Sequence, residues 1–220
     1  MKRQLYFIIL FLFTFNHISA QRDTEHWFAP FSAANLSSLA KQAVYLSTDS
    51  TVPFPVEIYN NNTVITTITI SKGSPQYYYI DAADMIGSSS ADLFTVSSKG
   101  LYLKGTKPFF ATFRFTVPAH GEILTSKGKA GIGKKFYAVV APITNATAGM
   151  NFTTGVLATE DNTTVTVSGY APTVFFTKRC HRCSFSYFKY NLDKRAILYY
   201  RRQRKPARKS ERLYRCQNCF

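Results

Sequence analysis

The sequence predicts an all-β protein, built as an antiparallel β-sandwich. Short segments rich in β-branched and aromatic residues recur along the chain, and Gly, Pro and Asn residues separate them. Val64–Ser71 (VITTITIS) is β-branched almost throughout, which suits a pleated sheet and disfavours a helix. The expected strands follow one another at short spacing instead of alternating with helices, so a sandwich or barrel is favoured over βαβ units.

Residues 1–20 have the layout of a secretion signal. A Lys-Arg pair follows the initiator Met, and Leu5–Phe15 is an apolar segment too short to span a bilayer comfortably. Small residues precede the expected cleavage point after Ala20. We therefore expect export with cleavage before Gln21, no stable membrane span afterwards, and a secreted or cell-surface location. A membrane anchor is the alternative.

The formal net charge of +15 is concentrated at one end of the chain. Residues 178–220 hold 14 Lys and Arg residues and two acidic ones, a net charge of +12. Residues 21–177 hold 11 basic and 10 acidic residues and no cysteine. The near-neutral segment is predicted to be one β domain, which does not bind nucleic acid and must fold without disulfides. Residues 178–220 form a separate basic tail.

The start of the β domain is less regular than the rest. Trp27, Phe28 and Phe31 are expected to anchor the core or a sheet edge. Asn35–Ala43 can form a helical turn or two, and the β pattern begins at Val44.

A first hairpin is predicted from Val56–Tyr59 and Val64–Ser71, joined by Asn60–Asn62. Asparagine tolerates the left-handed backbone of a tight turn. We expect Val64–Ser71 to be a central strand. Its core-facing set is predicted to be the residues of one parity: Val64, Thr66, Ile68 and Ile70.

A second hairpin is predicted from Val156–Thr159 and Thr163–Val167, joined by Glu160–Asn162. Thr163–Val167 alternates polar and apolar residues and is also expected to be a central strand. Elsewhere, Lys72–Pro75 is a predicted turn and Asp81–Asp92 can hold a short helix. The remaining expected strands are Gln76–Ile80, Leu93–Ser97, Gly100–Leu103, Phe109–Val117, Phe136–Ala141, Met150–Thr153 and Val174–Thr177.

Four separated sequence motifs resemble those of a known family. They are PFFATFRF at Pro108–Phe115, HGEILTSKG at His120–Gly128, GKKFY at Gly133–Tyr137 and ATEDNTTVTVSGY at Ala158–Tyr170. Over roughly Val44–Thr177 the chain resembles the IgGFc-binding protein N-terminal domain, found in large secreted proteins of Bacteroidota-type bacteria and in an animal mucus protein. The resemblance implies an exported, non-catalytic binding or adhesion module that recognises an extracellular protein or glycan. It supplies no catalytic residues, and Fc binding is not carried over from the animal member.

An accessory β domain of a secreted carbohydrate-active enzyme or hydrolase is the alternative function. No nucleophile motif such as G-x-S-x-G marks an active site, so the chain is not expected to be an enzyme or to hold a cofactor. The residues that would bind a ligand are not predicted.

Three features of the main domain resemble sites but are better explained as structure. Gly128–Lys135 nearly matches a phosphate-binding loop, but Lys135 replaces the required hydroxyl, so a mobile loop that can touch an acidic partner is favoured. His26 and His120 lack a matching carboxylate cluster, and His120 is expected in a turn. Glu160–Asn162 could contribute to a calcium site, but turn capping is favoured.

The tail contains a candidate zinc site. Cys180 and Cys183 form one CxxC pair, Cys216 and Cys219 form another, and His181 lies nearby. Basic residues between the pairs would suit nucleic acid, so a zinc-dependent nucleic-acid binder is the second alternative function. Expected export and the cysteine-free main domain oppose it.

A shifted reading frame explains the tail better. Permitted codons for residues 194–220, read one nucleotide later, can encode a segment with the strand, turn and glycine character of the family. We therefore expect a frameshift after about Thr177 and a sandwich that is incomplete at its C-terminal end. Since Arg201–Arg215 is too charged to pair and bury, the tail is expected to be disordered or weakly helical.

Overall fold

The computed structural model describes residues 21–32, 41–87, 94–117, 120–138, 152–170, 175–176, 187–192, 194 and 197–203. Strands dominate these residues, which confirms the all-β class. The predicted secretion signal and all four cysteines lie outside the described residues.

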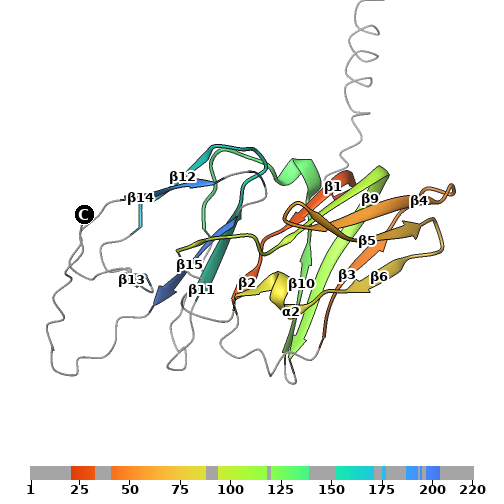
Figure 1. Ribbon diagram of the computed structural model, residues 1–220, viewed down its shortest axis with the longest axis horizontal. Helices are drawn as coiled ribbons and strands as arrows, with labels where there is room; N and C mark the ends of the chain where they lie inside the picture. Colours follow the sequence, from red (N-terminus) through yellow and green to blue (C-terminus); the bar gives the residue numbers. More distant parts are fainter. Residues whose placement is uncertain are drawn as a thin grey trace, which may run out of the picture.

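Seven strands form the largest sheet, and every pairing in it is antiparallel. Figure 1 shows this sheet around the long strand β9, away from the smaller sheets that contain β11 to β15. The strand order is β5 (Thr63–Ile70), β4 (Phe54–Asn60), β9 (Leu101–Val117), β3 (Lys41–Ser47) and β6 (Gln76–Tyr79), with β1 (Asp23–Phe28) and β10 (His120–Thr125) also paired to β9.

Strand β9 belongs to both halves of this sheet. Its first half pairs with β1 and β4, and its second half pairs with β3 and β10. Two separate strands were expected here, Gly100–Leu103 and Phe109–Val117, but the structure has one strand of 17 residues. Asp23 pairs with Phe109 and Glu25 with Lys104, so β9 carries extra residues between these pairs and turns a corner there.

The core lies mainly on one face of the large sheet. Along β3 the large buried apolar residues are Val44 and Leu46, and along the second half of β9 the buried apolar residues include Phe109, Ala111 and Phe113. This period of two is the pattern of a sheet with one face packed and one face open. The main core cluster is Phe28, Val44, Leu46, Phe54, Val56, Ile58, Ile70, Ile80, Met85, Leu101, Leu103, Phe109, Ala111 and Phe113.

The start of the domain partly matches expectation. Phe28 is buried in the core, and Phe31 packs against it, stacked on Phe113 with ring centroids 5.4 Å apart. The expected helical turn over Asn35–Ala43 is wrong for residues 41–43, which lie in β3; residues 33–40 are outside the described part. Pairing with both β6 and β9 fixes this segment as a strand.

The β4–β5 hairpin is confirmed, and an asparagine makes its turn. Asn61 adopts a left-handed backbone with φ of 52°. The predicted core set is only partly right, because the register shifts between Ile58 and Tyr59. This bulge lets Ile65 pack against the core and leaves Val64 44% exposed, whereas Ile70 remains buried.

Neither strand expected to be central is central among the described strands. Strand β5 ends the strand order of the large sheet, and β12 (Thr163–Ser168) pairs only with β14 (Tyr187–Leu192). The second predicted hairpin is also wrong, because β11 (Phe152–Leu157) pairs with β15 (Ile197–Gln203) instead of β12. The connection therefore carries the chain from one sheet to another.

The remaining elements are short. Strand β8 (Val96–Ser97) and β13 (Phe175–Phe176) pair with β15, and β2 (Phe31–Ser32) pairs in parallel with β7 (Ile86–Gly87). The short helix predicted within Asp81–Asp92 is confirmed as α2 (Ala82–Met85), and β7 begins directly after it. Residues 136–138 of the strand expected at Phe136–Ala141 are not in a strand.

The tail was expected to contain no strands, and this is wrong for its described residues. Strand β14 pairs with β12 and β15 pairs with β11, with Arg201 opposite Thr153. Leu192 is buried against Ala158 in a second, small core. Aromatic and β-branched residues favour strands, and backbone pairing does not require a charged side chain to be buried. This result does not test the proposed reading-frame shift, which stays a prediction.

Truncating a buried residue at one end of β5 should cost more stability than truncating an exposed residue at the other end. We expect Ile70→Ala to lower the free energy of unfolding by about 2–5 kcal/mol, because it leaves a cavity in the main core. Val64→Ala is the matched control and should change it by about 0.5 kcal/mol or less. Urea unfolding followed by fluorescence measures both values. Equal losses would contradict the observed bulge.

Candidate functional site

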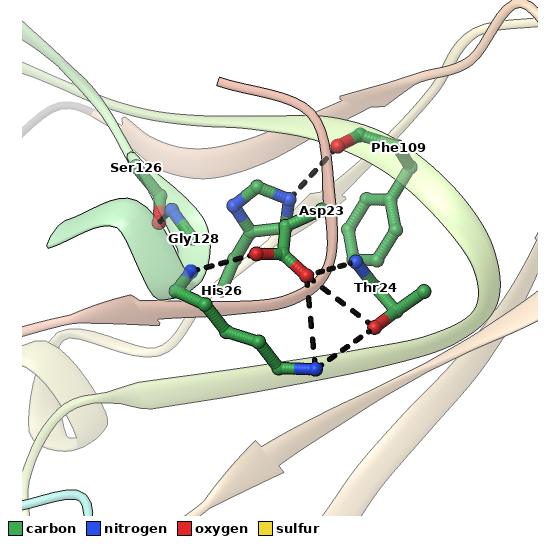
Figure 2. A network of polar contacts seen from close by, with 7 residues as sticks. Asp23, Thr24, His26, Phe109, Ser126 and Gly128 are labelled. Atoms are coloured by element: carbon green, nitrogen blue, oxygen red, sulfur yellow. Dashed lines mark hydrogen bonds and ion pairs between the residues drawn. The ribbon is translucent and has the colours of Figure 1, made fainter. Parts of the chain in front are cut away.

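Two groups of side chains stand out, a polar network at the start of β1 and an exposed aromatic face. In the network, Figure 2 shows the Asp23 carboxylate between β1 and the 3-10 helix η3 (Gly128–Gly131). Its oxygens accept hydrogen bonds from the amides of Thr24 (2.6 Å) and Lys129 (2.8 Å). The Lys129 ammonium lies 3.9 Å from the same carboxylate. Burial raises the pKa of Asp23, but these donors and this charge outweigh it and hold the pKa below its ordinary value.

Gly128 allows this close approach of two chain segments. Its φ of +57° is left-handed, and a side chain there would overlap Asp23. The Gly128 amide donates to the Ser126 hydroxyl at 3.2 Å, and the Ser126 amide donates to the Ala111 carbonyl at 3.1 Å. The loop expected to be mobile at Gly128–Lys135 is therefore tied to β1 and β9 at its start, and the phosphate-loop resemblance has no matching geometry.

His26 is completely buried where β9 turns its corner. Its Nε2 lies 2.8 Å from the Phe109 carbonyl, and its ring meets the Phe109 ring edge-on at 4.6 Å. Burial lowers the pKa of His26, and the Phe109 carbonyl and the Asp23 charge only partly offset this. A neutral ring that donates from Nε2 satisfies the carbonyl and leaves Nδ1 without a partner.

Asp23, His26 and Ser126 have the residue types of a hydrolase triad but not its geometry. The Ser126 hydroxyl accepts from the amides of Gly128 and Trp27, and the His26 Nε2 is bound to Phe109. A nucleophile needs a base within hydrogen-bond reach and access to substrate. His26 instead faces the core, so this network holds β1, β9 and η3 together.

The second group lies on the open face of β6, β3 and β9, opposite the core. We call it the tyrosine face: Lys41, Tyr45, Tyr77, Tyr79 and Arg114. Tyr77 and Tyr79 are 54% and 49% exposed, and Tyr45 is 37% exposed. Tyr45 and Tyr77 face each other across β3 and β6, with centroids 5.7 Å apart, and Tyr77 and Tyr79 are 5.2 Å apart.

Two cations complete the tyrosine face. The Lys41 ammonium lies 5.1 Å from the centre of the Tyr79 ring, and the Arg114 guanidinium lies 4.5 Å from that of Tyr45. Each position uses the attraction between a cation and the negative face of an aromatic ring. Ala43 lies between Tyr79 and Arg114 in the pairing and is buried beneath this surface.

Most of the candidate site residues named from the sequence lie outside both groups. His120 begins strand β10, so its expected place in a turn is wrong. The Thr163 hydroxyl donates to the Glu160 carbonyl at 2.7 Å, so Thr163 is a capping side chain of this turn. The Asp161 carboxylate, predicted to cap the turn, instead accepts a hydrogen bond from the distant Lys194 amide at 2.9 Å. In the part of the chain that the structure describes, no three His, Cys, Asp or Glu side chains gather as a metal site would require.

The sequence contains a signal for the tyrosine face in the alternation of its residues. Lys41, Ala43 and Tyr45 are alternate residues of one segment, and Tyr77 and Tyr79 are alternate residues of another, so each set lies on one face of its strand. Only the pairing of β3 with β6 and β9 shows that these residues meet.

Known proteins give no further guide to the site. No family model, curated protein or solved structure matches the chain. Among the described residues, no helix is long and apolar enough to cross a membrane.

Acidification should destabilise the fold through His26. The folded protein lowers the pKa of this ring below its ordinary value of 6.5, so the unfolded chain binds a proton more readily. Stability from the neutral ring is complete above about pH 6.5 and falls as the pH drops towards the folded pKa. His26→Gln should be less stable at pH 7.5 but lack this decline. The difference in Tm between the two proteins should therefore shrink between pH 7.5 and pH 5; parallel curves would contradict the assignment.

Substitution of Gly128 should test the contact between η3 and β1. Gly128→Ala combines a left-handed backbone with overlap on Asp23, and should cost about 2 kcal/mol or more. Gly73→Ala is the matched control, because Gly73 has φ of +79° but no atom within 4 Å of an added Cβ. The control should cost about 1 kcal/mol. Urea unfolding measures both, and an equal cost would show that the overlap is relieved without loss.

Proposed function

We propose that this chain is an exported, non-catalytic binding module that contacts an extracellular protein or glycan through the tyrosine face. The observation that carries the proposal is the exposure of three neighbouring tyrosines on a sheet whose other side is the core. Tyrosine and arginine are the residues most often found at the energetic centres of interfaces. Tyrosine also offers a large contact area with few rotatable bonds to immobilise.

The fold favours binding on this face because the sheet presents it rigidly. Strand β3 lies between β6 and β9, and its Val44 and Leu46 side chains are buried in the core. The backbone positions from which the side chains of the opposite face project are therefore fixed before a ligand arrives. A surface arranged in advance loses less entropy on binding than a mobile one.

The sequence supports the location and the class of the module. The layout of residues 1–20 favours export to the cell surface or beyond, and the resemblance to the IgGFc-binding protein N-terminal domain favours adhesion. Export and adhesion are both inferred from sequence motifs, and the geometry of the tyrosine face does not depend on either inference.

An accessory domain for a carbohydrate-active enzyme is a second candidate, favoured by the same tyrosines. The C–H face of a sugar ring carries partial positive charge, so it packs well on the negative face of an aromatic ring. This candidate differs from the first in the ligand and in the neighbouring enzyme, and it uses the same surface.

Binding should depend on the tyrosine face. The full chain would be tested by biolayer interferometry against immobilised IgG Fc, mucin and a panel of neutral and acidic polysaccharides. For any probe that binds, Tyr77→Ala with Tyr79→Ala should weaken binding by roughly tenfold or more, the scale expected for interface anchors. Tyr137→Ala is the control, because Tyr137 is 80% exposed and lies outside the face. Unchanged binding by a folded double variant would overturn the proposal.

A further inference from the structure

We propose that the ligand of the tyrosine face is a polysaccharide that carries uronate carboxylates. Its sugar rings would pack on Tyr45 and Tyr77, and its carboxylates would bind Arg114 and Lys41. This inference rests on the proposed function and adds the class of ligand.

The charge of the face is one-sided. Strands β3, β6 and β10 and the second half of β9 contain one acidic residue, Glu122. Glu122 pairs with Phe115, which packs against the core, so the acid lies on the opposite side of the sheet from Arg114. An anionic ligand on the tyrosine face therefore meets two cations and no acid from these strands.

Both cations of the face are available to a ligand. Within the described part of the chain, the ion pairs join Arg22 to Asp49 and Lys129 to Asp23, and neither involves Lys41 or Arg114. The contacts that Lys41 and Arg114 make with Tyr79 and Tyr45 hold the charges in place without neutralising them. The planar Arg114 guanidinium can bind both oxygens of one carboxylate.

The other groups on the face suit a sugar polymer better than a protein. Tyr77, Tyr45, Thr112 and Thr125 lie in one row across four strands, since each pairs with the next. The row offers aromatic faces at one end and threonine hydroxyls, which can donate to and accept from sugar hydroxyls, at the other. Ile123, an exposed aliphatic residue opposite Arg114, lies at the edge of the face and does not fit this polar and aromatic character.

The low density of cations favours carboxylates over sulfates. One Arg and one Lys on this face match a polymer with about one charge per sugar, and a heavily sulfated chain would leave most of its charges unpaired. The ligand is therefore expected to gain as much from ring packing as from charge.

The test uses one polymer in two forms. Polygalacturonate and the same polymer after reduction of its carboxyl groups differ only at C6, where a neutral hydroxymethyl group replaces each carboxylate. We expect the full chain to bind the first at least about tenfold more tightly in affinity electrophoresis, and added salt to weaken this binding. Arg114→Gln should remove most of the preference. Lys104→Gln, the same charge change outside the tyrosine face, should leave it unchanged.

The outcomes separate this inference from the proposed function. Equal binding of the two polymers, or tighter binding of dextran sulfate or polyglutamate than of polygalacturonate, would overturn the uronate assignment while the face remained a binding site. Loss of the preference for polygalacturonate in the Arg114 variant, together with weaker binding of both polymers by the Tyr77/Tyr79 variant, each with an unchanged circular dichroism spectrum, would support it. Binding that none of these variants alters would overturn the proposed function as well.

Discussion

The large sheet depends on the corner in strand β9, and the hydrogen bond between His26 and the Phe109 carbonyl lies at that corner. Strand β9 leaves its pairing with β1 and β4 there and enters its pairing with β3 and β10. A strand that turns between two sets of partners exposes carbonyls that no ladder satisfies. His26 binds the Phe109 carbonyl, and Thr48 donates to the Pro108 carbonyl at 3.0 Å. Leaving a buried carbonyl unpaired would cost about 1–3 kcal/mol.

The corner also explains the residues packed around it. Pro108 cannot donate to a ladder, and such residues are tolerated where pairing is interrupted. Gly105 faces the Phe109 ring so closely that a Cβ would lie 3.0 Å from it, so the missing side chain makes room for the ring. The bond from His26 then links β1 to this corner, and the Asp23 carboxylate links β1 to η3.

Local patterns in the sequence predicted much of the local structure, and the strand pairings that were missed involve partners distant in the chain. The asparagine turn of β4–β5 could be predicted because both strands and their turn are contiguous. The pairing of β12 with β14 could not, because no residue in Thr163–Val167 indicates a partner beyond the next turn. Two strands were expected, at Gly100–Leu103 and Phe109–Val117, whereas the structure has one strand with Pro108 in its corner. His26 carries no local signal at all, since its role comes from a carbonyl 83 residues away.

The register of β3 determines both the stability of the sheet and the residues of its proposed binding surface. Along β3, Val44 and Leu46 face the core while Lys41 and Tyr45 face outward. A slip of one residue would expose the aliphatic pair and turn the cation and the tyrosine inward, where a buried charge without a partner is costly. The core therefore selects the single register in which Tyr45 meets Tyr77 and Arg114 reaches the Tyr45 ring. Ala43 adds to this arrangement, because its small side chain lets the groups on β6 and β9 close over β3 from both sides.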